Sequence, residues 1–256
     1  MHCLVELQKR YPPGAFTIAA ATVDPGTAAF DPSPLIPYMK SLGVEYHYIK
    51  TEIMDTAGSG SLQGDSICAF CARMKRGALY TCCRAKHKNE LVLGQHLDDF
   101  AESFMMSAMF NGRLNTMKAS YMINQGDLRV IRPLAYTREK ETRDFSYAAG
   151  LPVINENCPA CFEEPKERRH VKKLLAREES MAPKLFQSLC TTILPLMDEH
   201  VQDTVNSTRT HIQTRAHPLN RVGGKDAEQW RERMKKRDKA SGRLARRESG
   251  STEPIA

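Results

Sequence analysis

The chain has 256 residues, and its 37 lysine and arginine residues against 30 aspartate and glutamate residues give a formal net charge of +7. No run of about 18 apolar residues occurs, so we expect no transmembrane helix and no membrane partner. The first residues lack the basic and then apolar segments of a secretory signal, and we therefore expect a cytoplasmic protein.

The positive charge is concentrated at the C-terminal end. Residues 201–256 carry 13 basic and seven acidic residues, a net charge of +6, whereas residues 1–200 are close to neutral at +1. A basic segment of this kind can contact phosphate backbones. The simpler interpretation, which we prefer, is a solvated and disordered tail.

Short apolar segments alternate with helical patterns along residues 1–200. The apolar segments predict strands at residues 16–23, 44–49, 91–94, 130–131 and 151–154. The helical patterns lie at residues 34–42, 68–89, 98–110, 137–149, 163–179 and 184–200. The expected signals at helix ends include Gly43, Gly112 and Gly150 as stops and Thr137 as a cap. Residues 55–66 are rich in Gly and Ser and predict a loop.

This alternation predicts an α/β fold with a parallel sheet. We expect an α/β domain over residues 1–155, a cysteine pair followed by helices over residues 156–200, and the basic tail over residues 201–256. Ligands bind such sheets where the strands end. Three segments therefore become site candidates, namely Asp24, residues 94–99 and Cys158, because each follows a predicted strand.

Two C-x-x-C pairs stand out among the eight cysteines, at Cys68 and Cys71 and at Cys158 and Cys161. In a long chain without a secretory signal, this pattern favours metal or cluster ligation over disulfides. The 86 residues between the pairs are too many for a compact zinc finger, but the pairs could converge in space. Spacing alone allows a zinc site with four cysteines or an iron–sulfur cluster. Buried or free thiols remain the alternative.

Adjacent carboxylates, Asp98 and Asp99, follow the predicted strand at residues 91–94. At a strand-to-helix junction they could hold Mg²⁺ or position a nucleotide. The alternative is an acidic helix cap, with His96 as a packed or surface imidazole.

Five segments in order carry a family resemblance. They read CAFCARMKRGALY at residues 68–80, LGQHLDD at 93–99, MFNGRL at 109–114, IRPLAY at 131–136 and CPAC at 158–161. Together they resemble the tRNA 2-thiocytidine synthetases, a branch of the PP-loop ATP pyrophosphatase superfamily, over roughly residues 1–200. The resemblance implies an adenine nucleotide alpha hydrolase-like (PP-loop ATPase) domain with a helical C-terminal part.

The resemblance also implies a reaction. ATP, accompanied by Mg²⁺, adenylates the C2 carbonyl oxygen of a cytidine in the tRNA anticodon loop, and sulfur then displaces AMP. The sulfur is handled on a [4Fe–4S] cluster that three cysteines hold, so that one iron stays open. By the resemblance the ligands are Cys68, Cys71 and Cys158, with Cys161 as the alternative to Cys158.

Further site residues follow from the resemblance alone. The catalytic residues would be Lys75, Asp98 and Asp99, and the nucleotide would bind at Asp24, Gly94 and His96. Lys75 would balance developing charge on the phosphates. The family usually has His directly after Gly94, whereas this chain has Gln95 there and His96 next.

The phosphate loop of the superfamily, S-G-G-x-D-S after a first strand, is absent from this sequence. Residues 1–8 resemble the middle of the helix that follows that loop. We therefore expect a truncated chain that lacks the first strand and the N–H groups that cradle pyrophosphate. We expect the 256-residue chain alone not to hydrolyse ATP.

Two other functions compete with this one. The tRNA uridine-34 thiolases of the same superfamily usually carry extra zinc-binding cysteines at both ends, and residues 191–256 contain no cysteine. A non-catalytic zinc- and RNA-binding module would use both cysteine pairs for one zinc ion. The partners expected are tRNA and a sulfur donor of unknown identity, and a homodimer is allowed. Candidate tRNA phosphate contacts are Arg73, Lys75, Arg76, Arg113 and Lys118, each of which could equally be a solvated charge.

Overall fold

A computed structural model describes residues 1–27, 30–58, 67–123, 125–154 and 167–198. The chain divides into two compact units at residue 201, and the described residues all belong to the first, Met1–Val201. None of the helices in these ranges has the length and apolar character needed to cross a bilayer.

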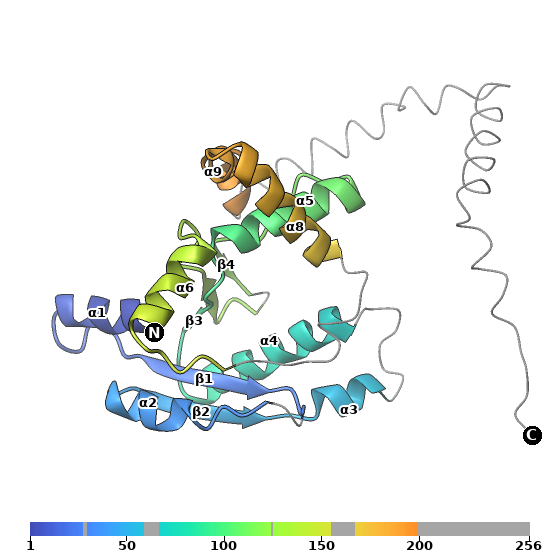
Figure 1. Ribbon diagram of the computed structural model, residues 1–256. Coiled ribbons are helices and arrows are strands. Elements are labelled where there is room, and N and C mark those ends of the chain that lie inside the picture. The colour runs from blue at the N-terminus through green and yellow to red at the C-terminus, as the bar shows by residue number, and fades with distance from the viewer. Residues whose placement is uncertain (28–29, 59–66, 124, 155–166, 199–256) are drawn as a thin grey trace, which may run out of the picture. The chain divides into compact units, whose positions relative to one another are not determined.

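The strands of the described residues form two sheets (Figure 1). In the first sheet, β1 (Ala19–Asp24) pairs in parallel with β2 (Glu45–Lys50), so that Asp24 lies opposite Lys50. In the second, β3 (Glu90–Val92) is parallel to β5 (Arg129–Ile131), which is antiparallel to β4 (Ser120–Met122). The α/β class with parallel strands is confirmed, while β4, only three residues long, was not predicted.

Helices surround these strands. Their bounds are α1 (His2–Arg10), α2 (Leu35–Ser41), α3 (Ile53–Gly58), α4 (Ile67–Ala85), α5 (Leu97–Asn111), α6 (Glu139–Ala148), α8 (Glu167–Met181) and α9 (Leu185–Ile193), followed by the 3₁₀ helix η1 (Leu194–Met197). The predicted stops hold where glycine adopts a left-handed conformation, as at Gly112, which ends α5 with φ +58°.

Four sequence predictions differ from the structure. Residues 55–58 belong to α3 rather than to a loop, because Ala57 is buried against the core. The segment 151–154 forms no strand; Pro152 has no N–H to donate, and Val153 is 63% exposed. The cap of α6 is Arg138, one residue after Thr137. The last predicted helix, residues 184–200, is α-helical only as far as Ile193, after which the chain forms the 3₁₀ helix η1.

Helix α4 connects the two sheets. It contacts both β1 and β3. Phe70 of α4 is buried with Val23 and Ile53, and Leu79 packs against this cluster as well as against the cluster of Leu91 and Val130. Burial of one such aromatic side chain contributes about 2–3 kcal/mol. The helix that carries the first cysteine pair is therefore fixed against the strands whose ends carry the other candidate residues.

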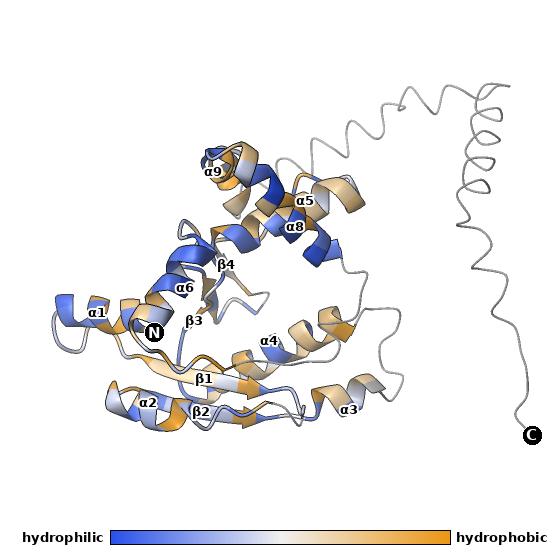
Figure 2. Ribbon diagram, viewed as in Figure 1, coloured by the Kyte–Doolittle hydropathy of each residue, from blue (hydrophilic) through white to orange (hydrophobic). Residues whose placement is uncertain are grey.

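The helical part has its own core around α5. Phe100 and Phe104 of α5 pack with Val171 of α8 and with Phe186 and Ile193 of α9. Figure 2 shows α6 and α8 as predominantly hydrophilic, which fits helices that expose one face to solvent. This packing sets the beginning of α5, where Asp98 and Asp99 lie, against α6 and α8.

Candidate functional site

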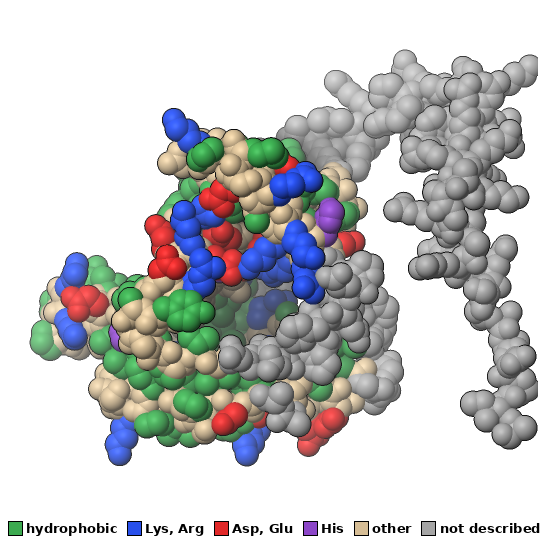
Figure 3. Space-filling model, in the orientation of Figure 1, with side chains coloured by type: hydrophobic (Ala, Val, Ile, Leu, Met, Phe, Trp, Pro, Cys, Tyr) green, Lys and Arg blue, Asp and Glu red, His purple; other side chains and the backbone are tan. Residues whose placement is uncertain are grey.

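One face of this unit is hollowed. Lysine and arginine side chains lie at the rim of the hollow and within it, and over α6 and α8 they alternate with acidic side chains (Figure 3). The candidate residues of the sequence analysis come from the strand ends and from α4, and each is taken in turn below.

The first cysteine pair lies in the first two turns of α4. Cys68 is exposed, and Cys71 is half-buried against the cluster that contains Phe70. Spacings of three and four residues put Cys68, Cys71 and Lys75 on one side of the helix. Cys158 and Cys161 lie outside the described residues. Within the described ranges, no three His, Cys, Asp or Glu side chains come together in a way that could hold a metal ion.

Asp24 is the last residue of β1, and three hydrogen bonds fix its position. Its carboxylate accepts hydrogen bonds from the backbone N–H of Gly26 (2.8 Å) and from the hydroxyl of Tyr48 on β2. This hydrogen bond raises the pKa of Tyr48 to about 12, so the phenol stays protonated and donates. The hydroxyl of Thr51 donates to the backbone carbonyl of Asp24 at 2.5 Å. Asp24 is thus oriented by three neighbours at the end of the strand.

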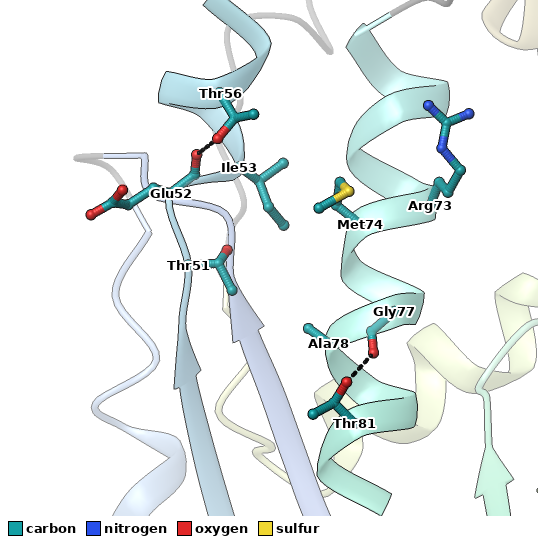
Figure 4. A pocket seen from close by; sticks show the side chains of 9 residues that line it. All are labelled: Thr51, Glu52, Ile53, Thr56, Arg73, Met74, Gly77, Ala78 and Thr81. Atoms are coloured by element: carbon teal, nitrogen blue, oxygen red, sulfur yellow. Dashed lines mark hydrogen bonds between the residues drawn. The ribbon is translucent and has the colours of Figure 1, made fainter. Parts of the chain in front are cut away.

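A pocket of about 540 Å³ lies between α3 and α4 (Figure 4). Ile53 and Met74 face each other across it, and Arg73 lies on the other side of α4. Its remaining lining consists of Thr51, Glu52, Thr56, Gly77, Ala78 and Thr81. None of the predicted catalytic, nucleotide or cysteine residues lines this pocket, so its size alone does not make it the site.

The junction between β3 and α5 forms a capping box at His96. The backbone N–H of Asp99 donates to His96 Nδ1 at 3.4 Å, and the N–H of His96 donates to the Asp99 carboxylate at 3.0 Å. The acidic helix cap that the sequence allowed is therefore present. Gly94 lies two residues before His96 and is exposed.

Asp98 is buried and bonded to α6. Nε and Nη2 of Arg138 donate to its carboxylate at 3.1–3.3 Å, and the N–H of Glu139 donates at 2.7 Å. Burial by itself would raise the pKa of Asp98, but these donors outweigh it and hold the pKa below its ordinary value. Nη1 of Arg138 also forms an ion pair with Oε1 of Glu179 on α8 at 2.7 Å. The guanidinium carbon of Arg138 lies 3.4 Å from the centre of the Phe186 ring.

A second arginine pairs with Asp99. Arg168 of α8 forms ion pairs with Asp99 and, at 2.7 Å, with the buried Glu102 of α5. Burial raises the pKa of Glu102 above its ordinary value, and Arg168 only partly opposes this. A further ion pair joins Lys172 of α8 to Glu139 of α6 at 2.6 Å.

Sequence reasoning missed these partners because they lie 33 to 69 positions away from the carboxylates. Another prediction changes as well: Lys118, a candidate tRNA contact, donates to the backbone carbonyls of Leu196 and Asp198 and so anchors the end of the helical part. Arg73, Arg76 and Arg113 are exposed, as a phosphate contact requires.

Comparison with known proteins adds sequence and structural relatives. No family model matches. The tRNA-cytidine(32) 2-sulfurtransferase of Geobacter sulfurreducens is 33% identical over 203 residues, which are 79% of this chain and 79% of the relative. The protein of the same name from Pelobacter propionicus is 34% identical over 200 residues, 78% and 74% of the two chains.

A solved structure with a similar fold is among the matches. The U34-tRNA thiolase NcsA from Methanococcus maripaludis, with its [4Fe–4S] cluster, superposes with a TM-score of 0.62 at 19% identity, over 77% of this chain and 66% of that one. At this identity the likeness supports the fold alone, and it confirms the predicted fold class.

Proposed function

Because the chain belongs to the tRNA-cytidine(32) 2-sulfurtransferase family, we propose that it replaces the C2 oxygen of a tRNA cytidine with sulfur in an ATP-dependent reaction. The observation that carries this proposal is the 33% identity over 203 residues, which spans about four fifths of both chains. The names of these relatives favour cytidine over the uridine-34 alternative.

The cysteines of α4 fit a [4Fe–4S] cluster. Cys68 and Cys71 lie on one side of the helix, and thiolates are the ligands that iron–sulfur clusters use. We assign Cys158 as the third ligand, with Cys161 as its alternative. A cluster with three cysteine ligands would supply one iron that can bind sulfide.

We assign the other residues to the nucleotide and its activation. ATP would transfer its AMP to the C2 oxygen of cytidine and release pyrophosphate; sulfur would then attack C2, and AMP would leave with the oxygen. Lys75 would balance the charge that develops on the phosphates. Asp24, Gly94 and His96 stand at the ends of β1 and β3, where nucleotides bind α/β sheets.

The two carboxylates of α5 differ in what they can still accept. Both oxygens of Asp98 accept two hydrogen bonds each, from Arg138 and from the N–H of Glu139, which fills the roughly four acceptor positions of a carboxylate. Asp99 accepts one bond on each oxygen. We therefore propose that Asp99 meets the Mg²⁺ that accompanies ATP and that Asp98 positions the loop before α5.

The test is sulfur transfer by the anaerobically reconstituted chain. Unmodified tRNA, ATP, Mg²⁺ and sulfide are added, and the digested tRNA is examined for 2-thiocytidine by mass spectrometry. Cys68→Ser is expected to abolish the product and the cluster absorbance near 400 nm, whereas Cys82→Ser on the same helix leaves both unchanged. Pyrophosphate release in this assay would overturn the expectation that this chain, which lacks S-G-G-x-D-S, does not hydrolyse ATP by itself.

Other outcomes identify the competing functions. Thiolated uridine in place of cytidine would support the uridine-34 thiolase. A colourless protein that holds one zinc ion and transfers no sulfur would support the non-catalytic module and refute the proposal.

A further inference from the structure

Two neighbouring strands end beside a buried arginine. β3 and β5 are parallel, with Val92 opposite Ile131, so the residues that follow them meet at the same edge. Gln95 follows β3 and Arg132 follows β5, and the Nε–H of Arg132 donates to the Gln95 side-chain oxygen at 3.0 Å. Gln95 thus holds the guanidinium through a neutral oxygen.

The positive charge of Arg132 has no negative partner among the residues that the structure describes. Its side chain contacts Gln95, donates to the carbonyl of Lys118 at 2.5 Å and lies 5.5 Å from the ring centre of Tyr121. Arg132 is only 8% exposed. A buried charge without a counter-charge is costly. Three of its five N–H groups remain for another acceptor.

Two tyrosines lie near this arginine: its guanidinium is 5.5 Å from the ring centre of Tyr121, and its charge acts on Tyr80. Tyr80 of α4 and Tyr121 of β4 have their hydroxyl oxygens 3.3 Å apart. One O–H donates to the other oxygen, which leaves the second O–H to donate elsewhere. Burial and this hydrogen bond raise the pKa of Tyr80 to about 12, against the opposing charges of Arg76 and Arg132, so it stays protonated at neutral pH.

The donor cluster, defined as Tyr80, Gln95, Tyr121 and Arg132, therefore offers N–H and O–H groups and contains no carboxylate. A dense set of donors with one fixed positive charge suits phosphate oxygens. The cluster lies at the carboxyl ends of parallel strands, beside Gly94. Lys75 and Arg76 precede Tyr80 by about one turn of α4, and the hollowed face bears further basic side chains (Figure 3).

We propose that Arg132 and the donor cluster bind a phosphate group of the nucleotide substrate. This inference rests on the proposed function for the identity of the nucleotide, but the phosphate site itself can be tested without sulfur transfer. An anion at Arg132 would supply the counter-charge that the described residues do not. Gln95 would act as a positioning residue that orients the guanidinium.

The experiment compares Arg132→Met and Arg132→Lys with Arg129→Met as the matched control. Arg129 begins the same strand, β5, but is exposed, and among the described residues its side chain donates to the hydroxyl of Ser120. Binding of ATP, inorganic pyrophosphate and adenosine to the full chain is measured by calorimetry. Loss of charge-assisted hydrogen bonds is expected to weaken ATP and pyrophosphate binding by about 10- to 100-fold in Arg132→Met, and less in Arg132→Lys. Adenosine binding, and all binding by Arg129→Met, should be unchanged.

The results separate this inference from the proposed function. Unchanged pyrophosphate affinity in both Arg132 variants, or a wild-type chain that binds no pyrophosphate, would overturn the inference. Equal losses for adenosine and pyrophosphate would overturn it too, by indicating a structural role for Arg132. A chain that binds pyrophosphate through Arg132 but makes no thiocytidine would support the inference and refute the proposed function.

Discussion

Removal of the Arg138 side chain should destabilise the helical part strongly. Arg138→Met leaves Asp98 and Glu179 without their shared cation, and the side chain of Asp98 is only 12% exposed. Breaking a buried ion pair on one side costs about 3–5 kcal/mol. Because Glu179 is more exposed than Asp98, we expect the lower end, about 3 kcal/mol, or roughly a 150-fold change in the unfolding equilibrium.

The assay is urea unfolding followed by circular dichroism. Arg143→Met is the matched control on the same helix, because Arg143 and its partner Asp144 are both well exposed; we expect a change of at most about 0.5 kcal/mol. The pKa of Asp98 is lowered in the folded protein, so its stabilising contribution is present above the unfolded pKa of about 4 and is lost as the pH falls through the folded value. The difference between wild type and Arg138→Met should therefore shrink in acid. Equal stabilities of the Arg138 and Arg143 variants at pH 7 would refute this reasoning.

Two further predictions concern the end of β1. Gly26→Ala should destabilise the fold by about 1–3 kcal/mol, since φ is +84° and a Cβ would lie 2.9 Å from the carbonyl oxygen of Thr51; Gly14→Ala has the same φ in open space and isolates the cost of the contact in thermal melts. Tyr48 should ionise near pH 12 in an ultraviolet titration, and Asp24→Asn should lower that midpoint. Because the folded pKa of Tyr48 is raised, its contribution to stability is present below the unfolded value of about 10 and is lost as the pH rises toward 12. A midpoint near pH 10 in the wild type would contradict the hydrogen bond to Asp24.

Much of the fold could be predicted because its signals are local. Gly43 and Gly112 both adopt positive φ where the sequence places a helix stop. The segments that failed depend on distant neighbours. Residues 55–58 have a loop-like composition, but Ala57 becomes helical and buried through contacts with Val23 and Phe70, which no local pattern records. Conversely, residues 151–154 have strand-like composition and find no neighbouring strand.

Helix α5 also shows the difference between local sequence signals and contacts with distant residues. Met105 and Met106 pack against the core, whereas Met109, about one turn later on the same helix, is 45% exposed. Periodicity identifies a helical face, and only the tertiary structure decides how far along that face the covering continues.

The candidate site shows the same limit of sequence-based prediction. The rule that ligands gather at strand ends located Asp24 and residues 94–99, since it depends only on the order of strands and helices. It could not indicate that Arg138 and Arg168 would neutralise Asp98 and Asp99, because those arginines lie 40 and 69 positions from the carboxylates that they bind. Nor could it separate a carboxylate whose acceptor positions are filled from one that can still meet a cation.

Arg132 differs from Arg138 and Arg168 in the acidic partners that surround it. At the beginning of α5, Arg138 is matched by Asp98 and Glu179, and Arg168 by Asp99 and Glu102. In these pairs each charge offsets the desolvation of its partner, and the pairs link α5 and α8 with the beginning of α6. Arg132 is more buried than Arg168, yet its described contacts are a carbonyl, an amide oxygen and an aromatic ring. A buried guanidinium at a strand end, with no carboxylate among its described contacts, is placed to bind an anion, as we propose for a phosphate of the nucleotide.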